Sequence, residues 1–290
     1  MGAIAFGCWR FAGVDLATAT ARVNAALDCG MTLVDTADVY GLDNGCPWGA
    51  AEELLGSVLE AHPALRDRMV LATKGGIQLQ RGTGLGVPYD ASARNVRDAC
   101  DASLRRLRTD RIDLYQIHRP DLLAHPAETA EALGALVAAG KVRFIGVSNY
   151  SPAQTRALMA HLDVPLITVQ PEFSVARLDP IDDGVLDLAM ECGLTPLAWS
   201  PLAGGRLMAE PAPDTRTAAI TTVLDELAAA RATTRTAIAL AFLLAHPSGV
   251  IPIIGTGRPE RIREAAAADG VELARDDCYR LIAAAGRDLP

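Results

Sequence analysis

Eight short apolar runs, separated by longer stretches of helical character, are the feature of this sequence that most restricts its fold. The runs are rich in Val, Ile and Leu and have few polar interruptions. Near-continuous apolar strands of this kind are typical of a parallel sheet buried on both faces. We therefore predict eight strands, at Ala3–Cys8, Met31–Thr36, Met69–Thr73, Ile112–Ile117, Val142–Val147, Leu166–Gln170, Thr195–Trp199 and Gly249–Ile254.

The stretches between these runs carry the three- and four-residue spacing of amphipathic helices, or signals that start a helix. They lie at Val96–Leu107, Ala130–Val137, Ser151-Pro152, Asp179-Pro180, Ala218–Ala230, Thr234–Ala245 and Arg275–Ala285. Eight strand-helix units in unbroken order favour a closed barrel over a doubly wound sheet, and no G-x-G-x-x-G follows any run. We expect residues 1–290 to form one α/β domain, a (β/α)8 TIM barrel with a C-terminal helix.

The composition excludes several other classes of protein. The formal net charge of −8 is unsuited to binding nucleic acid, and the longest apolar run, 237–245, is far shorter than the ~20 residues of a membrane span. The N-terminus has no signal-peptide pattern. The six cysteines are scattered, which indicates reduced thiols, and the histidines lack the spacing of metal ligands. We expect a cytoplasmic protein with no metal.

Polar residues stand at the ends of successive predicted strands, where barrel enzymes place their catalytic groups. Asp35, Lys74 and His118 end or directly follow the second, third and fourth runs, and Tyr40 lies in the loop after Asp35. Each alone has an ordinary explanation as a cap, surface or packing residue. Their order at consecutive strand ends favours a shared catalytic role.

These four side chains suit the reduction of a carbonyl group. Hydride delivered to carbon leaves charge on oxygen, which needs an electrophile and then a proton. Tyr40 is the candidate acid, although the ordinary pKa of tyrosine is ~10. The ammonium group of Lys74, held in its charged form by Asp35, is expected to lower the pKa of Tyr40. His118 is expected to orient the substrate oxygen by a hydrogen bond.

The later strand ends suit a nicotinamide cofactor. The side-chain amides of Asn149 and Gln170 offer the donor and acceptor that a carboxamide needs, and Trp199 supplies a flat apolar face. After the last run, the backbone amides and Thr256 suit a phosphate.

The same segment indicates which nicotinamide cofactor is bound. Arg258 and Arg261 can pair with a phosphate, and Gly255–Pro259 contains no acidic residue that would repel one. These features favour NADPH/NADP+ over NADH.

The ordered motifs resemble those of the aldo-keto reductase family. The string from Val34 to Gly41 resembles the motif of the catalytic Asp and Tyr, and Thr73-Lys74 and Ile117–Pro120 resemble the lysine and histidine positions. The cofactor motifs of the family are similar to Gly146–Tyr150 with Gln170, Trp199–Leu202 and Ile254–Arg261, and the Ala198–Leu207 run is similar to the bacterial branch near the potassium-channel β-subunit-like reductases.

This resemblance implies an NADPH-dependent reductase of aldehydes or ketones with Tyr40 as the general acid. The implied catalytic residues are Asp35, Tyr40, Lys74 and His118. The implied cofactor-binding residues are Ser148, Asn149, Gln170, Trp199, Ser200, Leu202, Gly204, Gly255, Thr256, Gly257, Arg258, Arg261 and Glu264.

Two departures from the family pattern affect these expectations. The family usually has a β-hairpin before the first strand, whereas this sequence starts almost at that strand, so we expect the hairpin to be missing or to lie upstream. The family also often has Asn after the Glu that follows the eighth strand. Here Ala265 follows Glu264, which removes one expected adenine contact.

The substrate residues and the activity leave alternatives. Trp9, Trp48, Tyr89 and Arg119 fall in loops expected at the mouth of the barrel, so each is a candidate substrate contact or a packing residue. A cofactor-binding regulatory or sensor protein would use the same pocket without useful turnover. An unrelated barrel isomerase or aldolase would use Lys74 to form a Schiff base.

Overall fold

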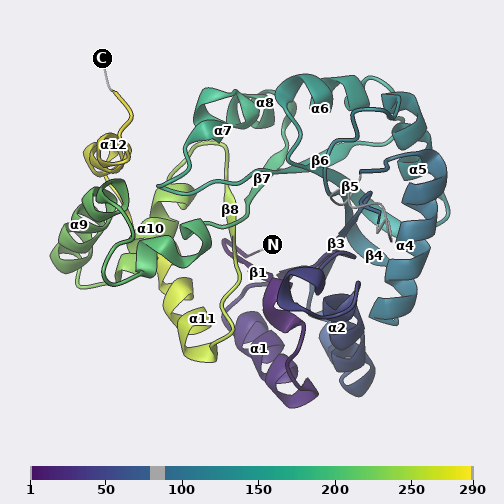
Figure 1. Cartoon of the computed structure of the whole chain (residues 1–290), viewed down its shortest axis with the longest axis horizontal. Coiled ribbons are helices and arrows are strands. Elements are labelled where there is room, and N and C mark those ends of the chain that lie inside the picture. The colour runs from purple at the N-terminus through teal and green to yellow at the C-terminus, as the bar shows by residue number, and fades with distance from the viewer. Residues whose placement is uncertain (1, 79–88, 289–290) are drawn as a thin grey trace.

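A closed barrel of eight parallel strands forms the centre of the molecule (Figure 1). The computed structural model describes residues 2–78 and 89–288. Each strand pairs with its neighbours in sequence, and the last pairs with the first. All eight predicted strands are confirmed, as β1 Ala5–Gly7, β2 Leu33–Asp35, β3 Val70–Gly75, β4 Ile112–Ile117, β5 Val142–Ser148, β6 Leu166–Gln170, β7 Thr195–Ala198 and β8 Ile251–Ile254.

Helices surround the barrel, and α9 and α12 lie side by side at the outer edge of this ring (Figure 1). The helices of eight residues or more are α1 Leu16–Asp28, α2 Ala50–Ala61, α4 Ala93–Leu107, α5 Pro126–Ala138, α6 Pro152–Met159, α8 Val185–Cys192, α9 Thr215–Ala230, α10 Arg235–Leu244, α11 Pro259–Ala266 and α12 Arg275–Ala284. Short helical turns include α3 Ala64–Asp67, α7 Asp179–Asp182, η1 Trp9–Phe11 and η3 Ala203–Met208.

Two expected helix starts illustrate what local sequence decides. Ser151 forms a capping box with Gln154 and begins α6, as predicted. The prediction for Asp179 is wrong in detail, because Leu178 is the N-cap of α7 and no side-chain cap bond forms. The segment is a single turn, so its placement depends on packing against α8.

No single helix in the described part of the chain has both the length and the apolar character needed to cross a membrane; only the bent pair α9 and α10, taken together, satisfies those criteria.

The interior of the barrel changes from apolar to polar along the strands. Its floor is filled by Ala5, Leu33, Ala72, Leu114, Leu197 and Ile253. Side chains on one face of a strand recur every second residue, so Asp35 follows Leu33 and Lys74 follows Ala72 on the inward face. The polar side chains are buried at the carboxyl ends of the strands. The candidate site therefore lies directly above an apolar floor.

Candidate active site

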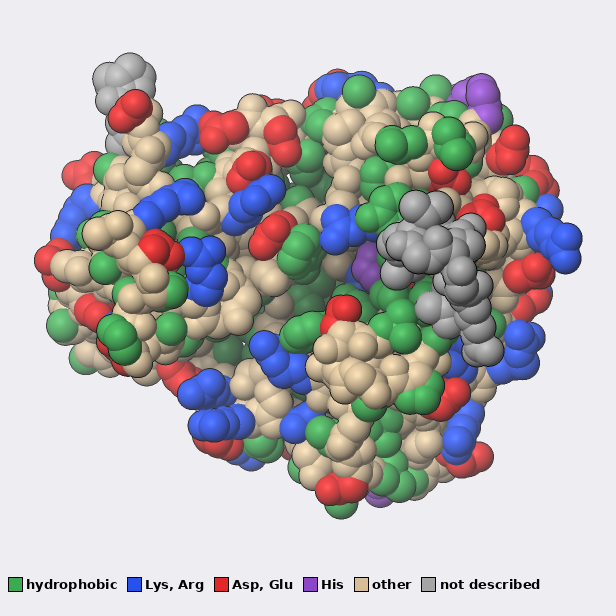
Figure 2. Space-filling view, viewed as in Figure 1, with side chains coloured by type: hydrophobic (Ala, Val, Ile, Leu, Met, Phe, Trp, Pro, Cys, Tyr) green, Lys and Arg blue, Asp and Glu red, His purple; other side chains and the backbone are tan. Residues whose placement is uncertain are grey.

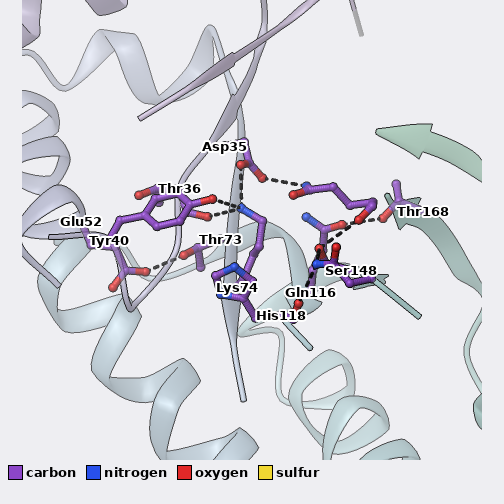
Figure 3. Close-up of polar contacts among 12 residues, drawn as sticks. Asp35, Thr36, Tyr40, Glu52, Thr73, Lys74, Gln116, His118, Ser148 and Thr168 are labelled. Atoms are coloured by element: carbon purple, nitrogen blue, oxygen red, sulfur yellow. Dashed lines mark hydrogen bonds and ion pairs between the residues drawn. The ribbon is translucent and has the colours of Figure 1, made fainter. Parts of the chain in front are cut away.

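A buried lysine forms the centre of the polar layer (Figure 3). The ammonium group of Lys74 donates to Asp35 Oδ2 at 2.6 Å, to the backbone oxygen of Thr36 at 2.8 Å and to the hydroxyl of Tyr40 at 3.2 Å. An ammonium has three donors, and these three acceptors use all of them. Tyr40 therefore accepts from Lys74, and its own O–H is left to donate elsewhere.

The charges of this group follow from burial and from the ion pair. Burial alone would lower the pKa of Lys74, but the carboxylate of Asp35 and the hydroxyl of Tyr40 outweigh it and raise the pKa, so Lys74 is charged at neutral pH. Burial raises the pKa of Tyr40 above its ordinary value, and Lys74 offsets only part of that rise. Lys74 therefore acts on Tyr40 in the expected direction, but burial has the larger effect and the net pKa is raised. Desolvation of the phenolate is the larger effect.

His118 lies beside the tyrosine and is uncharged. The rings of Tyr40 and His118 meet edge to face, with centroids 5.9 Å apart. Burial, the charge of Lys74 and the charge of Arg119 together lower the pKa of His118 well below its ordinary value. A neutral imidazole has one donor and one acceptor nitrogen, so His118 can hydrogen-bond to a substrate oxygen without competing for the proton of Tyr40.

The lowered pKa of His118 predicts a specific dependence of stability on pH. Below pH ~6.5 the unfolded chain protonates this imidazole and the folded chain does not, so the free energy of unfolding falls as the pH falls. Between pH 7.5 and 5.5 we expect the wild type to lose about 1 kcal/mol more than His118→Asn. Urea unfolding at both pH values measures this difference. Equal losses in the two proteins would show that His118 titrates normally.

A second buried cluster supports the strand that carries Lys74. Glu52 on α2 is fully buried and accepts from Thr73 Oγ1 at 2.5 Å and from Arg106 Nε at 2.7 Å. Asp38 is also buried, and burial together with the charge of Glu52 raises the pKa of Asp38 well above its usual range. The cluster joins α2 and α4 to the outward face of β3, directly beside Lys74 (Figure 3).

A cavity of about 1370 Å³ opens at the carboxyl ends of the strands. Figure 2 shows it as a hollow near the centre of the face, with Lys and Arg side chains along part of its rim. Pockets for drug-sized ligands are about 300–1,000 Å³, so the cavity has room for a dinucleotide and a small substrate. Asp35, Tyr40 and His118 line it, whereas Lys74 lies behind Tyr40.

The structure brings the predicted nicotinamide-binding residues together at one wall of this cavity. Asn149 donates to Ser148 Oγ at 2.8 Å and to the backbone oxygen of His118 at 3.3 Å, and it accepts from the indole of Trp199 at 3.0 Å. Gln170 donates to Asp35 at 3.1 Å. The amide oxygen of Gln170 and its second N–H remain available to a carboxamide.

The loops after β7 and β8 line another part of the cavity. Every other predicted cofactor residue lines it there: Ser200, Leu202, Gly204, Gly255, Thr256, Gly257, Arg258, Arg261 and Glu264. Asn149 and Ser200 have φ of 59° and 49°, which is a sparsely populated conformation for residues with a side chain. Such strain is concentrated at functional sites. Ala265, where the family often has Asn, also lines the cavity.

Three of the four predicted substrate residues line the cavity, and the fourth does not. Trp9, Tyr89 and Arg119 line the cavity, and the guanidinium of Arg119 lies 5.7 Å from the centre of the Trp199 ring. Trp48 is not among the lining residues. It lies just before α2, which packs on the outside of the barrel against α1 and α4. The assignment of Trp48 to the substrate is therefore not supported by its position.

Several cavity residues were not found by sequence reasoning. Asp43 accepts from the indole of Trp9 at 3.3 Å. Its position three residues after Tyr40 in the same loop could have identified it as a cavity residue. Arg10 and Arg22 line the cavity beside Gly255 and Gly257. Arg22 lies within α1, and no local pattern distinguishes it from a solvated helix residue.

Comparison with known proteins establishes the class. A sequence model of the aldo/keto reductase family matches residues 3–285. The chain belongs to the aldo/keto reductase family and is an oxidoreductase acting on carbonyl or alcohol groups.

The similar proteins carry related names. A 6-dehydroglucose reductase from Novosphingobium aromaticivorans is 50% identical over 99% of this chain and 93% of its own length. A second, from Agrobacterium fabrum, is 38% identical over 96% of the chain and 92% of its own length. Among solved structures, the glycerol dehydrogenase of Gluconobacter oxydans has a TM-score of 0.85 at 27% identity and covers 98% of this chain and 91% of its own.

Proposed function

We propose that this protein reduces an aldehyde to an alcohol with NADPH, and that Tyr40 is the general acid. The observation that carries the proposal is the use of all three Lys74 donors by Asp35, Thr36 and Tyr40. This arrangement leaves the phenol proton free beside the cavity. A bound reduced nicotinamide supplies the hydride.

The protein's own groups then have separate tasks. Tyr40 keeps its proton at neutral pH, because burial raises its pKa, and it donates that proton to the developing alkoxide. The charge of Lys74 stabilises the phenolate left behind, and Asp35 keeps Lys74 charged and in place. The neutral imidazole of His118 holds the substrate oxygen. Electrostatic stabilisation of this kind acts most strongly in a site that excludes water.

The phosphate end of the cavity fits a dinucleotide. Gly255 and Gly257 have no side chain, so the guanidinium groups of Arg10 and Arg22 lie close to the backbone of this segment. Helix α11 begins here with Pro259, and a helix N-terminus favours an anion. The hydroxyl of Thr256 accepts from the backbone of Arg258 at 3.3 Å and retains its own donor.

The names of the relatives favour an oxidised hexose as the substrate. Two relatives that cover almost the whole chain are named 6-dehydroglucose reductase. The loss of NADPH absorbance with a panel of sugar aldehydes, simple aldehydes and ketones tests the proposal. We expect the highest kcat/KM with a sugar carrying an aldehyde at carbon 6. Tight NADPH binding without turnover on any carbonyl would instead favour a sensor.

The choice of cofactor gives a separate prediction. Arg258→Ala removes a guanidinium from the segment expected to meet the 2′-phosphate. Hydrogen bonds to charged groups contribute ~1.5–3 kcal/mol, so we expect NADPH binding to weaken by about 10- to 150-fold and NADH binding to change little. Fluorescence titration of both cofactors measures the effect. Arg263→Ala, an exposed position on the same helix, is the control. If the wild type binds NADH as tightly as NADPH, this assignment is wrong.

A further inference from the structure

Two arginines from the N-terminal part of the chain lie across from the predicted phosphate segment. Arg10, in η1, donates from Nη1 to the backbone oxygen of Gly255 at 2.6 Å. Arg22, in α1, donates from Nη1 to the backbone oxygen of Arg10 at 2.9 Å. The chain of contacts from Arg22 through Arg10 to Gly255 joins α1 to the loop after β8, and α1 packs against α11.

Arg22 lies directly against the backbone of Gly257. A Cβ atom at Gly257 would be 2.9 Å from Nη2 of Arg22 and 3.1 Å from its Cζ. The glycine therefore allows the guanidinium to lie over the backbone of the segment. The Nε atom of Arg22 is buried and has no hydrogen-bond partner among the described residues. Because Nε is covered by the protein, a bound anion would meet the guanidinium at Nη2, for which no hydrogen bond is seen among the described residues.

Four arginines at this end of the cavity are without an ion-pair partner among the described residues, although Glu264 also lines the cavity there. Arg10, Arg22, Arg258 and Arg261 all line it, and none of the four forms an ion pair within residues 2–78 and 89–288. Asp15 is the carboxylate that acts on Arg22, but it caps α1 by accepting from the backbone of Thr18 at 2.7 Å. Four guanidinium groups in a protein of net charge −8 indicate a site for a multiply charged anion.

We propose that Arg22 contacts the 2′-phosphate of NADP(H) together with Arg258 and so helps to select this cofactor, with Arg10 as a positioning residue that holds Gly255. This inference rests on the proposed function. The diphosphate of the cofactor is the other anion that Arg22 could meet. Only the 2′-phosphate distinguishes NADPH from NADH. Comparing the binding of the two cofactors therefore shows whether Arg22 contacts the 2′-phosphate or the diphosphate.

The test uses Arg22→Met and Arg22→Lys in the full chain. Dissociation constants are measured by tryptophan fluorescence for NADPH and NADH, and by displacement of NADPH for 2′-AMP and 5′-AMP. We expect Arg22→Met to weaken NADPH and 2′-AMP by about tenfold or more, because a charge-assisted contact is lost, and to change NADH and 5′-AMP by less than about threefold. Arg22→Lys should lie between, since it keeps the charge but not the planar fork.

Other outcomes are decisive as well. Equal weakening of NADPH and NADH would place Arg22 at the diphosphate and overturn the proposal. Unchanged NADPH binding in Arg22→Met, with loss in Arg258→Ala, would overturn it and leave the proposed function intact. A wild type that binds 2′-AMP no more tightly than 5′-AMP would overturn the NADPH assignment itself. If thermal unfolding shows that Arg22→Met is unstable, Arg22→Gln, which keeps a donor for Arg10, replaces it.

Discussion

Tyr40→Phe is expected to lower kcat for aldehyde reduction by ~10²–10⁴-fold, the usual contribution of general acid catalysis. The substitution removes the phenol proton and keeps the ring that packs against His118 at 5.9 Å. Binding of NADPH should change little, because the cofactor does not need this proton. Single-turnover measurements with saturating NADPH follow the chemical step directly.

The control for this result is Tyr150→Phe. Tyr150 is half-buried and is not among the residues that line the cavity, so losing its hydroxyl should leave kcat within about twofold of the wild type. A near-normal rate in Tyr40→Phe would remove Tyr40 from proton transfer. His118 would then be a poor substitute acid, because its pKa is lowered by burial and by two neighbouring cations.

Arg106→Met is expected to lower the free energy of unfolding by about 3–5 kcal/mol, since it leaves a buried carboxylate without its partner. The side chain of Glu52 is 0% exposed and that of Arg106 17% exposed, with Nε and Oε2 2.7 Å apart. Urea unfolding at pH 7.5 measures the loss. The neighbouring Arg105 is exposed, so Arg105→Met should change stability by no more than ~0.5 kcal/mol.

A double variant separates the ion pair from simple packing. Glu52→Met combined with Arg106→Met removes both charges, and replacing a buried pair by apolar groups is often neutral. We expect the double variant to recover much of the stability that Arg106→Met loses. Equal stability losses in Arg106→Met and Arg105→Met would show that the carboxylate of Glu52 does not depend on Arg106. The cluster would then not support the strand that carries Lys74.

The sequence alone determined the barrel and the order of the candidate catalytic groups. Strand and helix periods are local properties, so all eight strands could be located before the fold was known. The order of Asp35, Tyr40, Lys74 and His118 also followed from the chain, because parallel strands in a barrel bring their carboxyl ends to one face.

The tertiary structure alone decided how these groups behave and what surrounds them. Burial raises the pKa of Tyr40 and Lys74 lowers it. The spacing of residues along the sequence does not show which of these two effects is larger. Glu52 and Arg106 are 54 residues apart, and Arg22 meets Gly257 only because the barrel closes β8 onto β1. Such contacts join distant segments, whereas sequence patterns record only the neighbours of each residue along one helix or strand.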